Sequence, residues 1–166
     1  APISLWGIQI NGGSGVVDNV AVTNNRISGT GSTAMVITGT TNVSVSGNTV
    51  TGVPEALFIS DRTTDFTASC NVMSATNLGI STGSYWSKAP NSNIRIFDNA
   101  ISGSIADIRN SLTQPLAIGS NWYGGGPSST SGSVQLADPL LADPTNGGAF
   151  DVAGCGDNTP TQIVAY

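Results

Sequence analysis

Four charged residues near the middle of the chain could take part in acid–base chemistry. Asp61 and Asp65 flank one bend, and Arg95 and Asp98 follow further along the chain. Hydrolysis of a glycosidic bond needs two carboxylates about 5 to 10 Å apart, one on either side of the bond. These residues are therefore catalytic candidates, although aspartate also favours turns in which its side chain bonds the backbone.

The strongest binding signal lies in one Ser- and Gly-rich segment, STGSYWSKAPNSN, which spans residues 81–93. Tyr85 and Trp86 place two adjacent aromatic rings on a polar loop, where they have little role unless they bind or pack. Packing of Trp86 onto the fold is the alternative to binding. The charged residues that could share a binding surface with the two rings are Lys88, Asp61, Arg62 and Arg109.

An internal repeat of ten residues must position these candidates, and its clearest copy is VSVSGNTVTG at residues 43–52. The other copies begin at Val20, Phe66, Ile94 and Leu116. Every copy has asparagine at its sixth position: Asn25, Asn48, Asn71, Asn99 and Asn121. The asparagines are 22 to 28 residues apart, and a period in that range is typical of a solenoid.

The pattern inside each copy identifies the type of solenoid. Apolar residues at the first and third positions alternate with polar ones, which predicts a strand with one buried face, and no helical period is present. Such strands would stack in parallel at about 4.8 Å per coil. We therefore expect an all-β parallel β-helix of about five to six coils, with coils over residues 1–125 and an irregular C-terminal capping tail over 126–166.

The repeated asparagine has a structural explanation. Its short side chain tolerates the left-handed conformation of a tight bend. Its amide both donates and accepts hydrogen bonds, so stacked copies could bond one another along the solenoid. Five copies are too many for a catalytic residue, and we interpret the column as a ladder that supports the fold.

The bend that precedes each repeated strand varies most in length and holds most of the charge. It includes Asp61, Arg62, Asp65 and Arg109, and its longest version is the segment 81–93. Because coils stack, these bends should line one edge of the solenoid. Insertions in repeat proteins collect on one face, which is often the binding face. This edge is the predicted contact surface.

The composition of the chain limits the kinds of partner that the protein can bind. Only 9% of residues are charged and the net charge is −5, with five scattered basic residues, so no nucleic-acid footprint exists. No apolar run is long enough to span a membrane. Abundant Ser, Thr and Asn with little Lys favours an extracellular, cell-surface or virion-surface protein.

Cys70 and Cys155 could pair or remain free thiols. The uncapped first strand suggests stacking on further coils or self-association.

The repeated N-x-(I/V)-x-G pattern, the NWYGGGP segment at residues 121–127 and LADPLLADP at residues 136–144 carry a resemblance to a known superfamily. Over about residues 5–145 the chain resembles the right-handed parallel β-helix proteins of the pectate-lyase-like superfamily. That superfamily includes pectate lyases, polygalacturonases, alginate epimerases, phage tailspikes and bacterial adhesins. The resemblance implies a right-handed coil and contact with long carbohydrate polymers.

The catalytic sets that the resemblance implies are incomplete. Polygalacturonase-like enzymes combine aspartates with a histidine, which this chain lacks. Lyase-type β-helices are expected to use Arg or Lys with acidic calcium ligands, and Arg95 beside Asp98 matches only part of that set. We therefore expect no metal or cofactor, with calcium unsupported by a complete motif. The leading hypothesis is a surface module of the adhesin, appendage or tailspike type that contacts polysaccharide or a partner surface. The alternative is a polysaccharide lyase or glycoside hydrolase.

Overall fold

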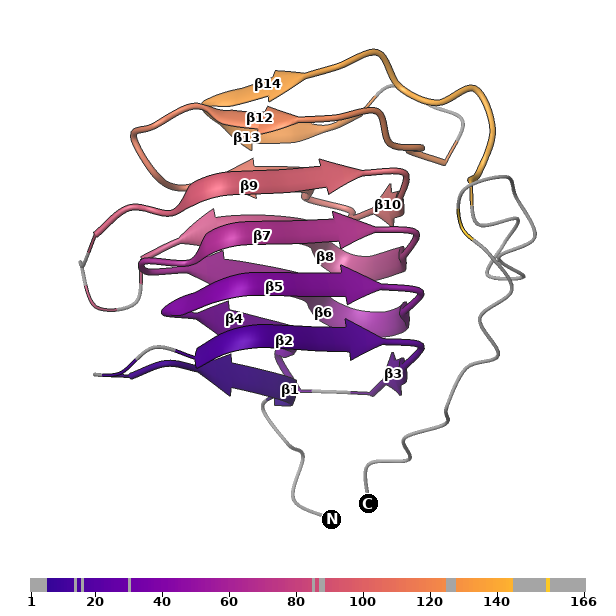
Figure 1. Cartoon of the computed structure of the whole chain (residues 1–166). Helices are drawn as coiled ribbons and strands as arrows, with labels where there is room; N and C mark the ends of the chain where they lie inside the picture. Colours follow the sequence, from indigo (N-terminus) through magenta and orange to yellow (C-terminus); the bar gives the residue numbers. More distant parts are fainter. Residues whose placement is uncertain are drawn as a thin grey trace.

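The computed structural model describes residues 6–13, 15, 17–29, 31–84, 86, 89–124, 128–144 and 155. The described chain is a parallel β-solenoid of about five turns (Figure 1), which confirms the predicted all-β coil. Its strands are β1 (Trp6–Asn11), β2 (Val17–Thr23), β3 (Arg26–Ser28), β4 (Thr33–Thr38), β5 (Thr40–Ser46), β6 (Thr49–Ser60), β7 (Thr64–Ser69), β8 (Val72–Gly83), β9 (Ser92–Phe97), β10 (Ala100–Ser102), β11 (Ala106–Asn110), β12 (Leu116–Ile118), β13 (Thr130–Gly132) and β14 (Val134–Leu136).

Two stacked sheets form the walls of the solenoid. The large sheet follows the order β1-β4-β6-β8-β11-β13, with β3 and β10 paired to β6 and β8. The four-stranded sheet follows β2-β5-β7-β9 and contains the strands of the first four repeat copies, whereas the strand of the fifth copy, β12, pairs with β14. The four-stranded sheet is the nearer wall in Figure 1. The sequence predicted about three strands per coil. In β6 and β8, the short strand after the ladder asparagine and the large-sheet strand form one continuous strand of 12 residues.

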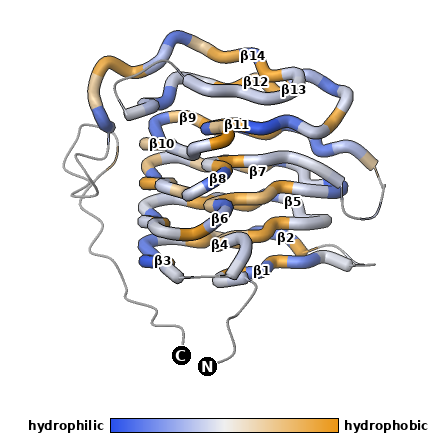
Figure 2. The backbone as a smooth tube through the Cα atoms, turned by 180° about the vertical axis from the view of Figure 1, so that it is seen from behind, coloured by the Kyte–Doolittle hydropathy of each residue, from blue (hydrophilic) through white to orange (hydrophobic). Residues whose placement is uncertain are grey.

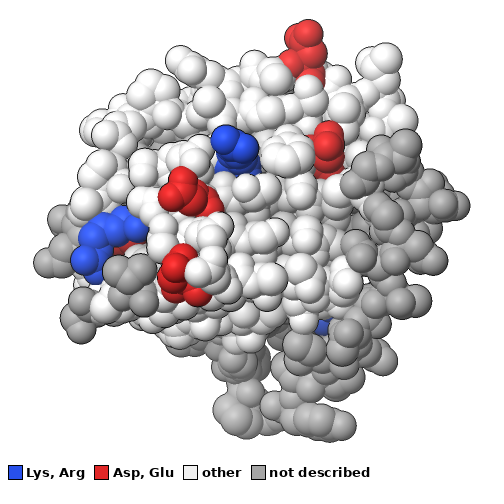
Figure 3. Space-filling model, viewed as in Figure 1, with Lys and Arg blue, Asp and Glu red and all other residues white. Residues whose placement is uncertain are grey.

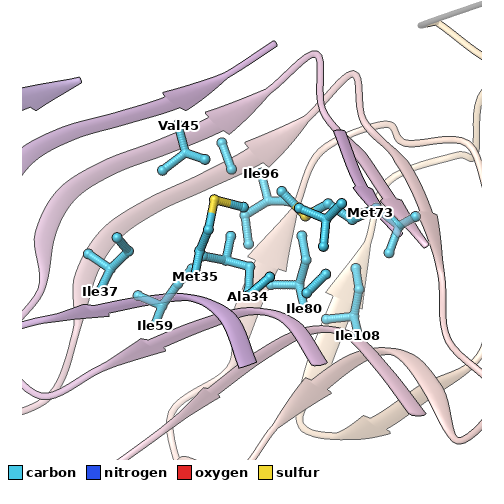
Figure 4. Packing of buried hydrophobic residues seen from close by; sticks show 14 of the residues in the cluster. Ala34, Met35, Ile37, Val45, Ile59, Met73, Ile80, Ile96 and Ile108 are labelled. Atoms are coloured by element: carbon cyan, nitrogen blue, oxygen red, sulfur yellow. The ribbon is translucent and has the colours of Figure 1, made fainter. Parts of the chain in front are cut away.

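The core lies between the two sheets and consists of the alternating apolar columns. Phe66, Met35, Leu57 and Ile80 are fully buried, and Figure 4 shows Met35, Val45, Ile80 and Ile96 pointing into the same interior. Figure 2 shows apolar segments recurring from coil to coil. Each coil buries its apolar face only by stacking on its neighbours, as expected of a solenoid.

The asparagine ladder is confirmed, and its geometry repeats at every step. The backbone N and the Nδ2 of Asn48 donate to Asn71 Oδ1 at 3.0 and 2.9 Å. Asn71 donates to Asn99 in the same way. Asn99 in turn donates to Asn121. These amides are fully buried, so each side chain satisfies polar groups at a bend that water does not reach.

Two columns of bend residues adopt the left-handed backbone conformation. One stands directly before the ladder and includes Asn24, Gly47, Cys70 and Asp98. The other stands at the start of the repeated strands and includes Asn19, Asn42, Asp65 and Asn93. Asn, Asp and Gly tolerate this conformation better than other residues, which explains their recurrence at these positions.

The C-terminal part of the chain continues the stacking beyond residue 125. β13 pairs in parallel with β11, and β14 pairs in parallel with β12. The parallel pairing of strands thus continues to Leu136. A disulfide joins Cys70 to Cys155. The rest of the predicted capping tail after residue 144 lies outside the described residues. No helix in the described part of the chain could cross a membrane.

Candidate functional site

A shallow hollow lies on the solenoid edge where the variable bends stack. Six residues from four successive bends line it: Gly13, Thr38, Gly39, Asp61, Arg62 and Trp86. We call this hollow the bend-edge site. The structure thus brings Trp86 of the longest insertion together with Asp61 and Arg62 of the preceding bend. Thr38, Gly13 and Gly39 were not among the predicted residues. They line the hollow only because neighbouring side chains pass close to them, and the sequence does not show which side chains do so.

Asp61 acts as an anchor for the insertion. It is only 3% exposed. Its Oδ1 accepts a hydrogen bond from Ser84 Oγ at 2.7 Å, and its Oδ2 accepts one from the backbone N of Trp86 at 3.1 Å. Its backbone has a φ of 34° and its carbonyl accepts from Gly39 N at 2.8 Å. Both carboxylate oxygens are therefore used in holding the bend and the start of the loop.

Arg62 links its own bend to two others by hydrogen bonds and spans four successive bends. Its backbone N donates to Ala89 O at 2.9 Å in the insertion of the next coil. In the other direction its Nη2 donates to Gly13 O at 2.7 Å, so the side chain passes over the bend at Gly39. A β-carbon at Gly39 would lie 3.7 Å from that Nη2. The guanidinium is thus held on the surface by its bond to Gly13 O.

Trp86 is the large aromatic side chain of the bend-edge site. It is 49% exposed, so one part of the indole contacts the bends and the other part faces solvent. The ring lines the hollow and still presents surface to solvent, and binding by Trp86 stays a prediction. Tyr85 and Lys88 lie outside the described residues.

None of the other catalytic candidates lines the bend-edge site. Asp65 is in β7, Arg95 is in β9 and Asp98 directly follows β9. Asp65 stands opposite Asn93, whose Nδ2 donates to Asp65 Oδ1 at 2.5 Å. Asp98 stands five residues further along, so the Cα positions of the two aspartates are about 16 Å apart along the strand direction. This exceeds the spacing of a glycosidase carboxylate pair. Arg95 projects outward from β9 between them, opposite Thr67 of β7.

The charged groups seen on the face of the four-stranded sheet are few and separated by uncharged side chains (Figure 3). Arg109 is on the large sheet instead, exposed on β11 and opposite Ser81 of β8. The charged residues predicted from the sequence therefore do not form one catalytic cluster. In the described residues, no group of three or more His, Cys, Asp or Glu side chains could hold a metal ion.

Two carboxylates that the sequence reasoning did not single out are buried or half-buried structural groups. Glu55 accepts hydrogen bonds from Thr33 Oγ1 at 2.6 Å and from Ser81 Oγ, which belong to the coils on either side. Asp107 accepts from the backbone N of Ser129 at 2.7 Å. Both carboxylates connect neighbouring coils by hydrogen bonds, and no sequence motif predicts this role.

Comparison of the chain with protein-family models, curated proteins and solved structures found no match. The parallel β-solenoid is therefore established by the geometry described above.

Proposed function

We propose that this β-solenoid is a surface module that binds carbohydrate at the bend-edge site. The observation that carries the proposal is the half-exposed indole of Trp86 beside the fixed guanidinium of Arg62. The electron-rich face of an indole attracts the weakly positive C–H groups of a sugar ring. A guanidinium donates to hydroxyl or carboxylate oxygens in a fixed geometry. Together they suit a ligand that has both an apolar face and many oxygen atoms.

The setting of the site agrees with an extracellular or surface location. The disulfide between Cys70 and Cys155 favours an oxidising compartment. The low content of charged residues, 9% of the chain, leaves no electrostatic feature suited to nucleic acid. These points support an adhesin, appendage or tailspike type of role, in which the ligand is a glycan surface.

A glycan panel tests the proposal directly. We expect the protein to bind at least one glycan and Trp86→Ala to lose that binding. Phe97→Ala is the matched control, because Phe97 is an aromatic residue of 36% exposure on a different surface, the strand β9. Equal binding by parent and Trp86→Ala would refute the site, and no binding to any glycan by the parent would refute the function.

The same incubations test the enzymatic alternative. New reducing ends or unsaturated sugar products would show that the protein cleaves a polysaccharide. No arrangement of the described carboxylates favours this activity over binding, because Asp61 anchors the insertion and Asp65 and Asp98 are far apart. We therefore expect binding without product formation.

A further inference from the structure

We propose that the N-terminal end of the solenoid is a docking surface for one further parallel β-coil that carries an asparagine at the ladder position. This inference concerns the end formed by β1, β2 and β3 and does not depend on the carbohydrate site.

The ladder is incomplete at this end. At each internal step, an asparagine Oδ1 accepts hydrogen bonds from the backbone N and the Nδ2 of the preceding ladder residue. Asn25 donates both of its groups to Asn48 Oδ1, but no described residue donates to Asn25 Oδ1. Asn25 is only 8% exposed as a residue, and its Oδ1 is the first acceptor of the described ladder.

A second bond of the ladder is also absent at Asn25. The Nδ2 of each later asparagine donates to a backbone carbonyl of the coil before it; the acceptors for Asn48, Asn71, Asn99 and Asn121 are Val22, Val45, Ala68 and Ile96. Among the described residues, Asn25 Nδ2 bonds only Thr23 O of its own coil and Asn48 Oδ1 of the next. Both hydrogens of Asn25 Nδ2 already have acceptors, so an added coil would supply donors to Asn25 Oδ1 and a third, shared acceptor to Nδ2.

The strand edges of this end match a parallel coil in the same way. β1, β2 and β3 pair on one side with β4, β5 and β6, and no described strand pairs with their other side. These edges carry the backbone donors and acceptors that one more parallel strand on each would satisfy.

The inner side chains indicate that the docked coil has an apolar inner face. Ile8 and Ile10 are half-buried, whereas Met35 and Ile37, which stand opposite them in β4, are 0% exposed. The C-terminal end differs, because Asn121 is fully buried and its carbonyl accepts from Leu140 N at 2.9 Å. The N-terminal end therefore has the polar and apolar features of an internal coil boundary.

A duplicated coil tests this proposal. Thr33 pairs with Glu55 and Trp6 pairs with Thr33, so residues 33–54 are one complete coil. A copy of residues 33–54 is fused directly before Trp6. The first control is the chain that begins at Trp6, and the second is the fusion in which the copied ladder asparagine is alanine. The readouts are the urea midpoint and hydrogen exchange of the β1 and β2 amides.

We expect the copied coil to raise the midpoint above the first control and to slow exchange in β1 and β2 by at least about tenfold. The alanine version should give a smaller change, because it cannot donate a side-chain hydrogen bond to Asn25 Oδ1. The proposal would be overturned if the copied coil left the urea midpoint and the amide exchange unchanged. It would also be overturned if both fusions had equal effects, or if the fusion disrupted the existing coils. Concentration-dependent dimerisation of the first control that the copied coil abolishes would assign the end to a second copy and would also overturn it.

Discussion

The ladder asparagines should differ in their contribution to stability according to how many groups depend on them. In Asn71→Ala, the backbone N–H of Asn48 loses the Oδ1 acceptor that it bonds at 3.0 Å. That N–H belongs to a residue that is fully buried, so water cannot replace the acceptor. One orphaned buried donor costs about 1–3 kcal/mol, and we expect the free energy of unfolding to fall by that amount.

Asn25→Ala is the matched control, because it removes the same side chain from the end of the same ladder. No described residue donates to Asn25 Oδ1, and Asn48 Oδ1 keeps the backbone N of residue 25 as a donor at 3.0 Å. The substitution therefore leaves no buried donor unpaired, and we expect a loss under about 1 kcal/mol.

Urea unfolding followed by circular dichroism measures both variants, with the slope of the transition checked for constancy. The expected order of midpoints is parent, Asn25→Ala and then Asn71→Ala. Two equal losses would mean that the side-chain ladder contributes no more inside the solenoid than at its end. An unchanged midpoint for Asn71→Ala would refute the ladder as a source of stability.

Three further predictions concern other parts of the fold. Cys155→Ser, which removes the disulfide to Cys70 across 85 residues of sequence, should lower the free energy of unfolding by about 2–4 kcal/mol; equal midpoints for variant and parent would contradict this. Burial raises the pKa of Tyr123 to about 12. The unfolded chain then loses this proton first, and the contribution of Tyr123 to stability declines as the pH rises from about 10 to about 12. Tyr123→Phe should lack that decline when urea midpoints are measured across the same range, and an identical decline would assign it to other groups. Gly12→Ala should be more destabilising than Gly13→Ala. A β-carbon at Gly12 would lie 1.9 Å from a backbone oxygen of the next coil, whereas a β-carbon at Gly13 would have open space and meet only the strain of a φ of 52°, which costs about 1–2 kcal/mol. Similar midpoints for the two alanine variants would contradict this reasoning.

The solenoid and its ladder could be predicted because each coil repeats the same local requirements. An alternating strand and an asparagine recur in every copy, and a left-handed bend residue precedes the asparagine in the first four, so a single pattern specifies the stacking. The last strands could not be predicted in the same way. β13, with the sequence Thr-Ser-Gly, carries no apolar alternation, and it is positioned by pairing with β11.

The bend-edge site could be predicted only in part. Stacking of the variable bends places the insertion beside Asp61 and Arg62, and this neighbourhood depends on the backbone alone and not on side-chain conformation. The path of Arg62 to Gly13 depends on how its side chain crosses the bend at Gly39, which the repeat pattern does not specify. The anchoring role of Asp61 likewise depends on the direction of its carboxylate within a left-handed bend. Side-chain directions of this kind are decided by the three-dimensional contacts and leave no periodic signal.

The most direct test of carbohydrate binding at the bend-edge site is quenching of Trp86 fluorescence. The chain has three tryptophans, so replacing Trp6 and Trp122 with phenylalanine leaves Trp86 as the only indole. This protein is titrated with the best glycan from the panel, and quenching of its emission by acrylamide is measured with and without the ligand. Carbohydrate binding at this site predicts a shifted emission and reduced quenching in the complex. A glycan that binds with unchanged Trp86 emission and quenching would contradict it.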